Sequence, residues 1–272
     1  MTQFILTKFA ERPILSATIA LCLVVFLIQV ISALTFDRMI EYKEISYRSP
    51  ALPAEMDGYT IAFLSDIHNT PLERLRTIAD RVNRREADLL LLGGDFKMAE
   101  IGPILDIIQT IEPRDGIFGV YGNHDEPRAL EAAMSARGMT LLENSGLHLH
   151  QGFYLAGLRD FIIGQPDLNA ALAGAGECDF ILLLTHNPDA TMGSGFEQVN
   201  LSLAGHTHGG EVTLLGLWAP ALPLVSRYGQ RFRGGFAKSA ADTDVFVSHG
   251  IGQHLFRMMS RPQVIFLTLH HE

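Results

Sequence analysis

The chain has 272 residues, of which 47% are hydrophobic and 19% are charged, with a formal net charge of -9 at pH 7. This length suits one sizeable domain, and the acidic balance lacks the basic footprint of a nonspecific nucleic-acid binder, so a nucleic-acid partner is disfavoured. Two cysteines, Cys22 and Cys178, are too few for a disulfide framework.

The N-terminal region contains one long apolar stretch. Residues 13–36 read PILSATIALCLVVFLIQVISALTF and include no charged residue. As a helix rising about 1.5 Å per residue, this stretch exceeds the roughly 30 Å of a bilayer core. We therefore expect residues 1–36 to form a membrane anchor with a single transmembrane helix. A cleaved signal peptide is the alternative, although its apolar region is usually only about 7 to 15 residues long. Basic residues flank both ends, so the orientation stays open.

Residues 37–58 mix charged residues with Pro50, Pro53 and Gly58, which predicts a juxtamembrane linker. We expect the folded domain to occupy residues 59–272. Apolar runs of strand length recur there, namely YTIAFLS, DLLLLGG, GIFGVYG, FYLAGL, DFILLLT, NLSLAG, DVFVSH and QVIFLTL. Residues 72–82, 103–111 and 128–137 have helical spacing or composition. The alternation of strands and helices predicts an α/β fold with a largely parallel sheet at the start, and hairpins or a second sheet later.

Polar residues follow the ends of five of these strands. They are Asp66 and His68, Asp95, Asn123 with His124 and Asp125, His186, and finally His206 and His208. Each has a structural alternative as a helix cap, a turn residue or a hydrogen-bonded core histidine. However, the carboxyl ends of strands form the ligand-binding crevice of open α/β sheets, so we expect these groups to converge.

The chemistry of these groups indicates a metal centre. Carboxylates, an amide oxygen and imidazoles without thiolates suit divalent ions such as Mn, Fe or Zn. There are more ligands than one ion needs, which favours two ions. A pair of ions about 3.5 to 4 Å apart can promote in-line phosphoryl displacement.

The motifs SDIH, GGD, GNHD, THNPD and AGHTHGG occur in this order, and together they resemble the calcineurin-like metallophosphoesterases over about residues 59–270. The segments HNPD, GHTHGG, SRYG and VSHGIG are similar to a branch of small, often membrane-associated bacterial phosphodiesterases, the YkuE and YaeI type. Relatives of that branch hydrolyse UDP-2,3-diacylglucosamine. The protein serine/threonine phosphatases are disfavoured, because GGDFKMAE lacks their Asp-Arg-Gly continuation.

The resemblance implies a four-layer α/β/β/α sandwich of two mixed sheets. It also implies two metal sites that share Asp95 as a bridge and use a bridging hydroxide as the nucleophile. One site would use Asp66, His68, Asp95 and His208, and the other Asp95, Asn123, His186 and His206. His124 matches the family histidine that protonates or stabilises the leaving oxygen, and Asp125 would orient its ring.

The function implied is a single-pass phosphoesterase of the bacterial inner membrane that hydrolyses a phosphodiester or pyrophosphate bond, with a lipid-linked substrate as one option. A cyclic-nucleotide phosphodiesterase or nuclease on the same site is an alternative, and a non-catalytic metal-binding scaffold is another. The branch often has Gln where Glu211 stands, and SRPQV replaces its usual Pro-Pro-Glu stretch, so the substrate stays open. The oligomeric state and the side of the membrane that carries the domain stay open as well.

Residues 212–225, VTLLGLWAPALPLV, include the only Trp and precede the basic segment SRYGQRFRGGFAK. One hypothesis makes this stretch a loop at the rim of the site, with its apolar part toward lipid and its basic part toward phosphate head groups. The alternative is a buried hairpin followed by a solvated basic turn. We expect His249 and His254, which flank GIGQ, to be structural.

Overall fold

The computed structural model describes residues 12–96, 101–177, 179–252 and 256–272. Cys178, His254 and the start of the predicted anchor therefore lie outside the described residues.

Two six-stranded mixed sheets form the centre of the domain. The first has the order β1 (Glu41–Ser49), β12 (Gln263–His271), β2 (Thr60–Leu64), β3 (Leu89–Leu92), β4 (Ile117–Gly119) and β5 (Thr140–Leu141). The second has the order β10 (Gly235–Lys238), β11 (Asp244–Val247), β9 (Leu201–Ala204), β8 (Phe180–Leu184), β7 (Phe153–Gly157) and β6 (Ser145–His150). The pairs β2–β3 and β3–β4 are parallel, as the strand-helix alternation at the start of the domain predicts. The later strands form the second sheet, in which the pairs β7–β8, β8–β9 and β9–β11 are also parallel.

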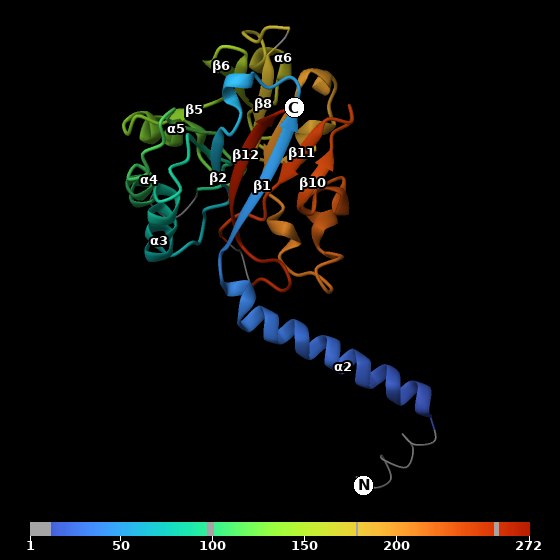
Figure 1. The fold of residues 1–272 in the computed structure, drawn as a ribbon. Helices are drawn as coiled ribbons and strands as arrows, with labels where there is room; N and C mark the ends of the chain where they lie inside the picture. The colour runs from blue at the N-terminus through green and yellow to red at the C-terminus, as the bar shows by residue number, and fades with distance from the viewer. Residues whose placement is uncertain (1–11, 97–100, 178, 253–255) are drawn as a thin grey trace.

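The two sheets pack face to face, and helices cover the outside of the first sheet. Successive side chains of a strand point to opposite faces, so Phe63 of β2 packs between the sheets while Leu64 packs under the helices. The outer helices are α3 (Leu72–Asn83), α4 (Gly102–Ile108) and α5 (Pro127–Ser135) (Figure 1). The outer face of the second sheet is covered by α6 (Leu168–Ala171) and the 3₁₀ turns η3 (Pro188–Met192) and η4 (Phe196–Gln198). The predicted four-layer sandwich is confirmed.

The predicted helices all form, because their sequences meet local requirements. In α3 the buried residues recur at helical spacing, namely Leu75, Ile78, Ala79 and Val82. Helix α5 begins with Pro127 in its first turn, and the Glu126 side chain caps it by accepting from the backbone N of Ala129.

The prediction that residues 37–58 form a linker is wrong. Residues 41–49 form β1, which pairs in parallel with β12 at the edge of the first sheet. The 3₁₀ turns η1 (Phe36–Arg38) and η2 (Ala54–Met56) flank it. Edge strands keep one side in solvent and so tolerate charge, which made EYKEISYRS look like a linker. Strands β5, β6 and β10 were also missed, because they are short or partly exposed.

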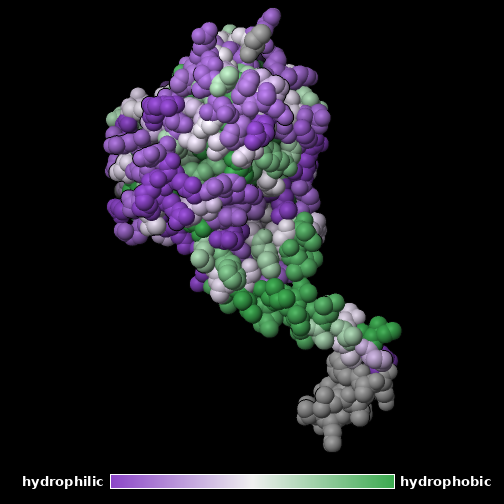
Figure 2. Space-filling view, in the orientation of Figure 1, coloured by the Kyte–Doolittle hydropathy of each residue, from purple (hydrophilic) through white to green (hydrophobic). Residues whose placement is uncertain are grey.

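Helix α2 (Pro13–Leu34) projects from one end of the domain (Figure 1). Among the described residues, it is the helix that is long and apolar enough to cross a membrane, and most of its surface is exposed. Figure 2 shows its apolar surface continuing onto the adjoining end of the domain.

The register of the first sheet places the strand ends relative to α2. Glu41, at the start of β1, pairs with Gln263, and Ile265, two residues further along β12, pairs with Phe63 near the end of β2. The carboxyl end of β2 therefore lies at the end of the sheet where α2 joins the domain. Strands β3 and β4 run parallel to β2, so their carboxyl ends lie there too.

Candidate metal centre

Six of the seven predicted ligands form two buried groups at this end of the sheets. Within each group the ligand atoms lie within 4.8 Å of one another. The first group is Asp66, His68 and His208, and the second is Asp95, His186 and His206. The short segment from His206 to His208 follows β9 and contributes one histidine to each group.

In the first group, two histidines face each other through the same type of nitrogen. The Nε2 atoms of His68 and His208 are 3.1 Å apart, and the Nε2 atom of His208 is 3.4 Å from Oδ1 of Asp66. Backbone amides also hold Asp66 in place, since the N of His206 donates to its Oδ1 at 2.9 Å.

In the second group, backbone carbonyls define which nitrogen of each histidine faces the other ligands of the group. Nδ1 of His186 lies 2.7 Å from the O of Gly93, and Nε2 of His206 lies 3.0 Å from the O of Val225. A carbonyl only accepts, so each of these nitrogens is the protonated one. The opposite nitrogens, Nε2 of His186 and Nδ1 of His206, are 3.2 Å apart, and the former is 3.4 Å from Oδ2 of Asp95.

These spacings fit divalent ions. Two nitrogens that each lie about 2.1 Å from one ion are separated by roughly 2.9 to 3.4 Å when the angle at the ion is between about 90° and 109°. Both nitrogen pairs fall in this range. The seventh predicted ligand, Asn123, adds a second observation: its Oδ1 is buried and has no hydrogen-bond partner among the described residues. A buried carbonyl oxygen without a donor is costly, and a cation would compensate for it.

The charges of the groups depend strongly on one another. Burial would raise the pKa of Asp95, but the charge of His186, a hydrogen bond from it and the backbone N of His124 lower it overall. Burial would lower the pKa of His186, but Asp95 raises it to about 10. Burial raises the pKa of Asp66 to about 6, and burial together with the charge of His186 lowers the pKa of His206 to about 4. Without a metal ion, His186 is therefore a cation paired with the carboxylate of Asp95, whereas His206 is neutral.

The backbone of the site is strained. Asp66, Asp95, His206 and His208 all have positive φ, at 51°, 57°, 70° and 51°. Such values are uncommon outside glycine and cluster at functional sites. The close approach also needs glycine, since a Cβ on Gly122 would lie 2.2 Å from Oδ1 of Asp95.

His124 and Asp125 both form hydrogen bonds with Asp95. The backbone N of His124 donates to Oδ1 of Asp95 at 2.9 Å, and the exposed His124 ring lies 5.9 Å from that of His68. The Asp125 carboxylate accepts from the backbone N atoms of Asp95, Phe96 and Gly122. Asp125 therefore fixes the turn that carries Asp95, and its role in orienting the His124 ring stays a prediction.

Sequence reasoning missed a buried arginine beside the site. Arg257 is only 2% exposed, and its guanidinium donates to the carbonyl oxygens of His208, His249 and Gly252, among others. It thereby joins the two loops at the back of the first group. A lone arginine in the apolar run LFRMM was the available signal, because an arginine is rarely buried unless it is paired.

A second missed residue is Asp189 of the HNPD segment. Its Oδ1 accepts from Oγ of Ser226 at 2.6 Å, and its Oδ2 accepts from the N of Arg227 at 2.8 Å. Asp189 therefore ties the end of the 212–225 stretch to the turn that follows His186.

A cleft of about 390 Å³ opens at the metal centre. Its polar wall carries Asp95, Asn123, His124, His206 and His208, and its apolar wall carries Ile162, Val212, Leu222, Leu224 and Val225. The 212–225 stretch is thus at the rim of the site. It is not a buried hairpin, since Leu217 and Leu224 are 77% and 87% exposed.

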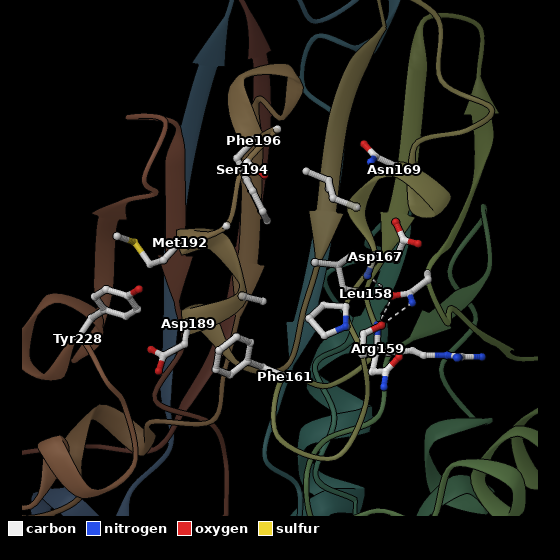
Figure 3. A pocket seen from close by; sticks show the side chains of 17 residues that line it. Leu158, Arg159, Phe161, Asp167, Asn169, Asp189, Met192, Ser194, Phe196 and Tyr228 are labelled. Carbon is white, nitrogen blue, oxygen red and sulfur yellow. Dashed lines mark hydrogen bonds between the residues drawn. The ribbon is translucent and has the colours of Figure 1, made fainter.

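Figure 3 shows a neighbouring cavity of about 700 Å³. Its lining includes none of the six residues of the two ligand groups. Phe161, Asp189 and Tyr228 border one side of it, and Arg159, Asp167 and Asn169 border the other. Phe161 lines this cavity while its neighbour Ile162 lines the metal cleft, so one short segment separates the two.

A family model described as calcineurin-like phosphoesterase matches residues 59–210, which is more than half of the chain. The chain belongs to the calcineurin-like phosphoesterase family. Both histidine groups lie in the matched region, and the family explains why carboxylates and imidazoles converge there. The match also confirms that the chain is a phosphoesterase of the metal-dependent type.

This phosphoesterase is 29% identical over 249 residues to the metallophosphoesterase YkuE of Bacillus subtilis, with 85% of this chain and 86% of YkuE covered. It is 27% identical over 232 residues to the phosphodiesterase YaeI of Escherichia coli, with 78% and 82% covered. Its fold is similar to that of a dimetal phosphatase from Danio rerio, with a TM-score of 0.50 and 11% identity over 79% of this chain and all of the other. That likeness concerns the fold alone.

Proposed function

We propose that the chain is a membrane-anchored phosphodiesterase or pyrophosphatase that uses two divalent ions, Mn, Fe or Zn. The observation that supports this most is the pair of buried Asp/His groups, joined by the segment from His206 to His208. The ligands would be Asp66, His68, Asp95, Asn123, His186, His206 and His208, with Asp95 between the ions. When bound, such ions polarise a phosphoryl oxygen and lower the pKa of water.

Residues of the chain would position the reacting groups and supply the proton during hydrolysis. A water oxygen bonds to phosphorus, the P–O bond to the leaving group breaks, and the leaving oxygen takes a proton. His124 is exposed at the polar wall of the cleft and is the residue we assign to that proton. Asp125 would hold the turn that positions both Asp95 and His124.

A lipid-linked substrate is the finer part of the proposal. The apolar wall of the cleft would accept an acyl or alkyl portion beside the scissile phosphate. That wall and the net charge of -9 weigh against a nuclease. Two complete ligand groups weigh against a scaffold, which has no need to keep them.

Membrane anchoring is supported by contacts of the apolar helix with the domain. Gln29, within α2, is 7% exposed, and its Nε2 donates to the O of Thr213 at 2.8 Å. A segment that is removed would have no reason to bury polar groups against the mature domain. We therefore propose that residues 13–36 are retained and that the catalytic domain begins with β1 at Glu41.

The test uses the full chain in detergent, loaded with Mn²⁺. We expect hydrolysis of bis-p-nitrophenyl phosphate to exceed that of p-nitrophenyl phosphate, and EDTA to abolish both. Activity that persists in EDTA would overturn the two-metal mechanism. A clear preference for the monoester would overturn the assignment as a diesterase.

A further inference from the structure

Helix α2 is held against the loop that borders the metal cleft. The side chain of Gln29 donates to the O of Thr213 and also contacts Sδ of Met258 at 3.1 Å. Further along, Oδ2 of Asp37 accepts from Oγ of Ser32 at 2.9 Å and from the N of Met259 at 2.7 Å. The end of the helix therefore has a fixed position relative to the 212–225 stretch and to residues 258–259.

The contact between Gln29 and Thr213 fixes the position of Thr213 along the axis of α2. Leu34, the last residue of α2, lies five positions after Gln29, which corresponds to about 7.5 Å along the helix axis. The apolar core of a bilayer takes about 20 helical residues, so a span that starts at Pro13 reaches its far edge near residue 33, beyond Gln29. If α2 crosses the membrane, Thr213 lies at the level of the lipid, and the residues after it cannot remain in bulk water.

The residues after Thr213 have the composition that this position requires. Leu214, Leu215 and Trp218 are 51%, 44% and 51% exposed, and Leu217 is 77% exposed. Tryptophan is enriched at membrane interfaces, and amphipathic segments bury their apolar face roughly 5 to 10 Å into the head-group boundary. Phe36 and Met39, just after α2, are exposed as well. Figure 2 shows apolar surface that continues from the helix onto the adjoining end of the domain.

The metal cleft lies at the same end of the domain as the junction with α2. The carboxyl ends of β2, β3 and β4 lie at the end of the sheet where α2 joins. The same stretch supplies Leu224 and Val225 to the apolar wall of the cleft, and the O of Val225 holds the ring of His206. An amphiphile that leaves the bilayer along this stretch therefore meets the metal ligands directly.

We propose that residues 213–225 form a docking loop that lies in the head-group region of a lipid bilayer, so that the cleft takes phosphoester head groups from the membrane surface. The occupant of the exposed apolar patch is thus the bilayer itself. This inference rests on the proposed membrane anchor, and it adds a second, shallower attachment whose position is set by the hydrogen bond from Gln29.

The single tryptophan of the chain provides a direct test. The full chain is reconstituted into phosphatidylcholine vesicles whose acyl chains are brominated at carbons 9 and 10. We expect the emission of Trp218 to be quenched relative to plain vesicles. A control variant combines Trp218→Phe with Gln151→Trp, in the exposed turn between β6 and β7 at the other end of the sheets, and it should not be quenched. Unquenched Trp218 in protein that floats with the vesicles overturns the docking loop.

A second experiment tests delivery of substrate. Leu214→Ser with Leu217→Ser removes apolar surface outside the cleft lining, while Leu214→Met with Leu217→Met keeps it. The serine variant should hydrolyse hexadecyl p-nitrophenyl phosphate in vesicles at least tenfold more slowly than the methionine variant. Both should hydrolyse soluble methyl p-nitrophenyl phosphate at the same rate. Equal losses on the two substrates overturn the delivery role.

These outcomes separate the inference from the function on which it rests. If the protein fails to float with the vesicles, the anchor and the docking loop are both overturned. If Trp218 is quenched but neither diester is hydrolysed in the presence of Mn²⁺, the proposed activity is overturned and the docking loop is supported.

Discussion

The guanidinium of Arg257 donates to the carbonyl oxygen of His208 at 3.1 Å, and His208 has a φ of 51°. A backbone conformation that is unfavourable for histidine is therefore held by a buried cation behind it. The same guanidinium reaches the O of His249 at 2.8 Å, so one side chain joins two loops that are distant in the sequence.

The variant Arg257→Met should lose both stability and metal. It leaves several buried carbonyl oxygens without a donor, which costs about 1 to 3 kcal/mol for each one, so we expect the free energy of unfolding to fall by roughly 3 kcal/mol or more. Chemical denaturation and metal analysis of the purified protein measure the two effects. Arg76→Met is the matched control, because Arg76 is exposed and forms a surface ion pair with Glu73 on α3. A metal content unchanged in Arg257→Met would show that His208 does not need this support.

Asp95→Asn and His124→Ala should separate metal binding from chemistry. Asp95 lies in the second ligand group, so its amide variant should lose bound metal together with activity. His124 is at the exposed wall of the cleft, so its alanine variant should keep the metal and lose about 10²- to 10⁴-fold in rate. Elemental analysis beside kcat measurements distinguishes the two. Loss of metal from His124→Ala would make this histidine a ligand and remove it from acid catalysis.

The sequence predicted the site better than the edges of the fold. Strands that are buried on both faces are continuous apolar runs, so β2, β3, β8 and β9 could be predicted from composition. Their ends carry the ligands, and the two predicted histidines His206 and His208 do meet different groups. In contrast, β1 carries charges on an exposed edge and was predicted to be a linker.

The contacts that organise the site from a distance could not be predicted. Asp189 and Ser226 are 37 residues apart, and Gln29 and Thr213 are 184 apart, so no local pattern joins them. The same holds for Arg257, because most of its partners are backbone carbonyls, which every residue has. These interactions depend on how the two sheets place their loops.

Gly122→Ala should disable the metal centre although it adds only a methyl group. The new Cβ would lie 2.2 Å from Oδ1 of Asp95 and 2.7 Å from the N of Asp95, which neither the carboxylate nor the backbone can accommodate without moving. We expect metal binding to weaken by at least tenfold, measured by titration of the metal-free protein. Gly102→Ala is the control, since the nearest atom that its Cβ would meet among the described residues belongs to the Arg137 side chain, at 3.6 Å. Normal metal binding by Gly122→Ala would mean that Asp95 can move freely.

The pH dependence of stability should reveal the neutral state of His249. Burial, followed by the charge of Arg257, lowers the pKa of His249 to about 3, against about 6.5 in the unfolded chain. The unfolded state therefore takes up the proton first as the pH falls. The stability contributed by neutral His249 is complete above pH 6.5 and is lost progressively toward pH 3.

Between pH 8 and pH 5 this loss amounts to about 2 kcal/mol at the limiting slope of roughly 1.4 kcal/mol per pH unit. His249→Gln removes the titrating group and keeps a donor for the O of Arg261, which the Nδ1 atom contacts at 3.2 Å. Guanidinium denaturation of both proteins in EDTA, followed by circular dichroism, should show that the variant loses about 2 kcal/mol less over this range. Parallel pH profiles for the two proteins would mean that His249 is charged in the folded state or reaches water there.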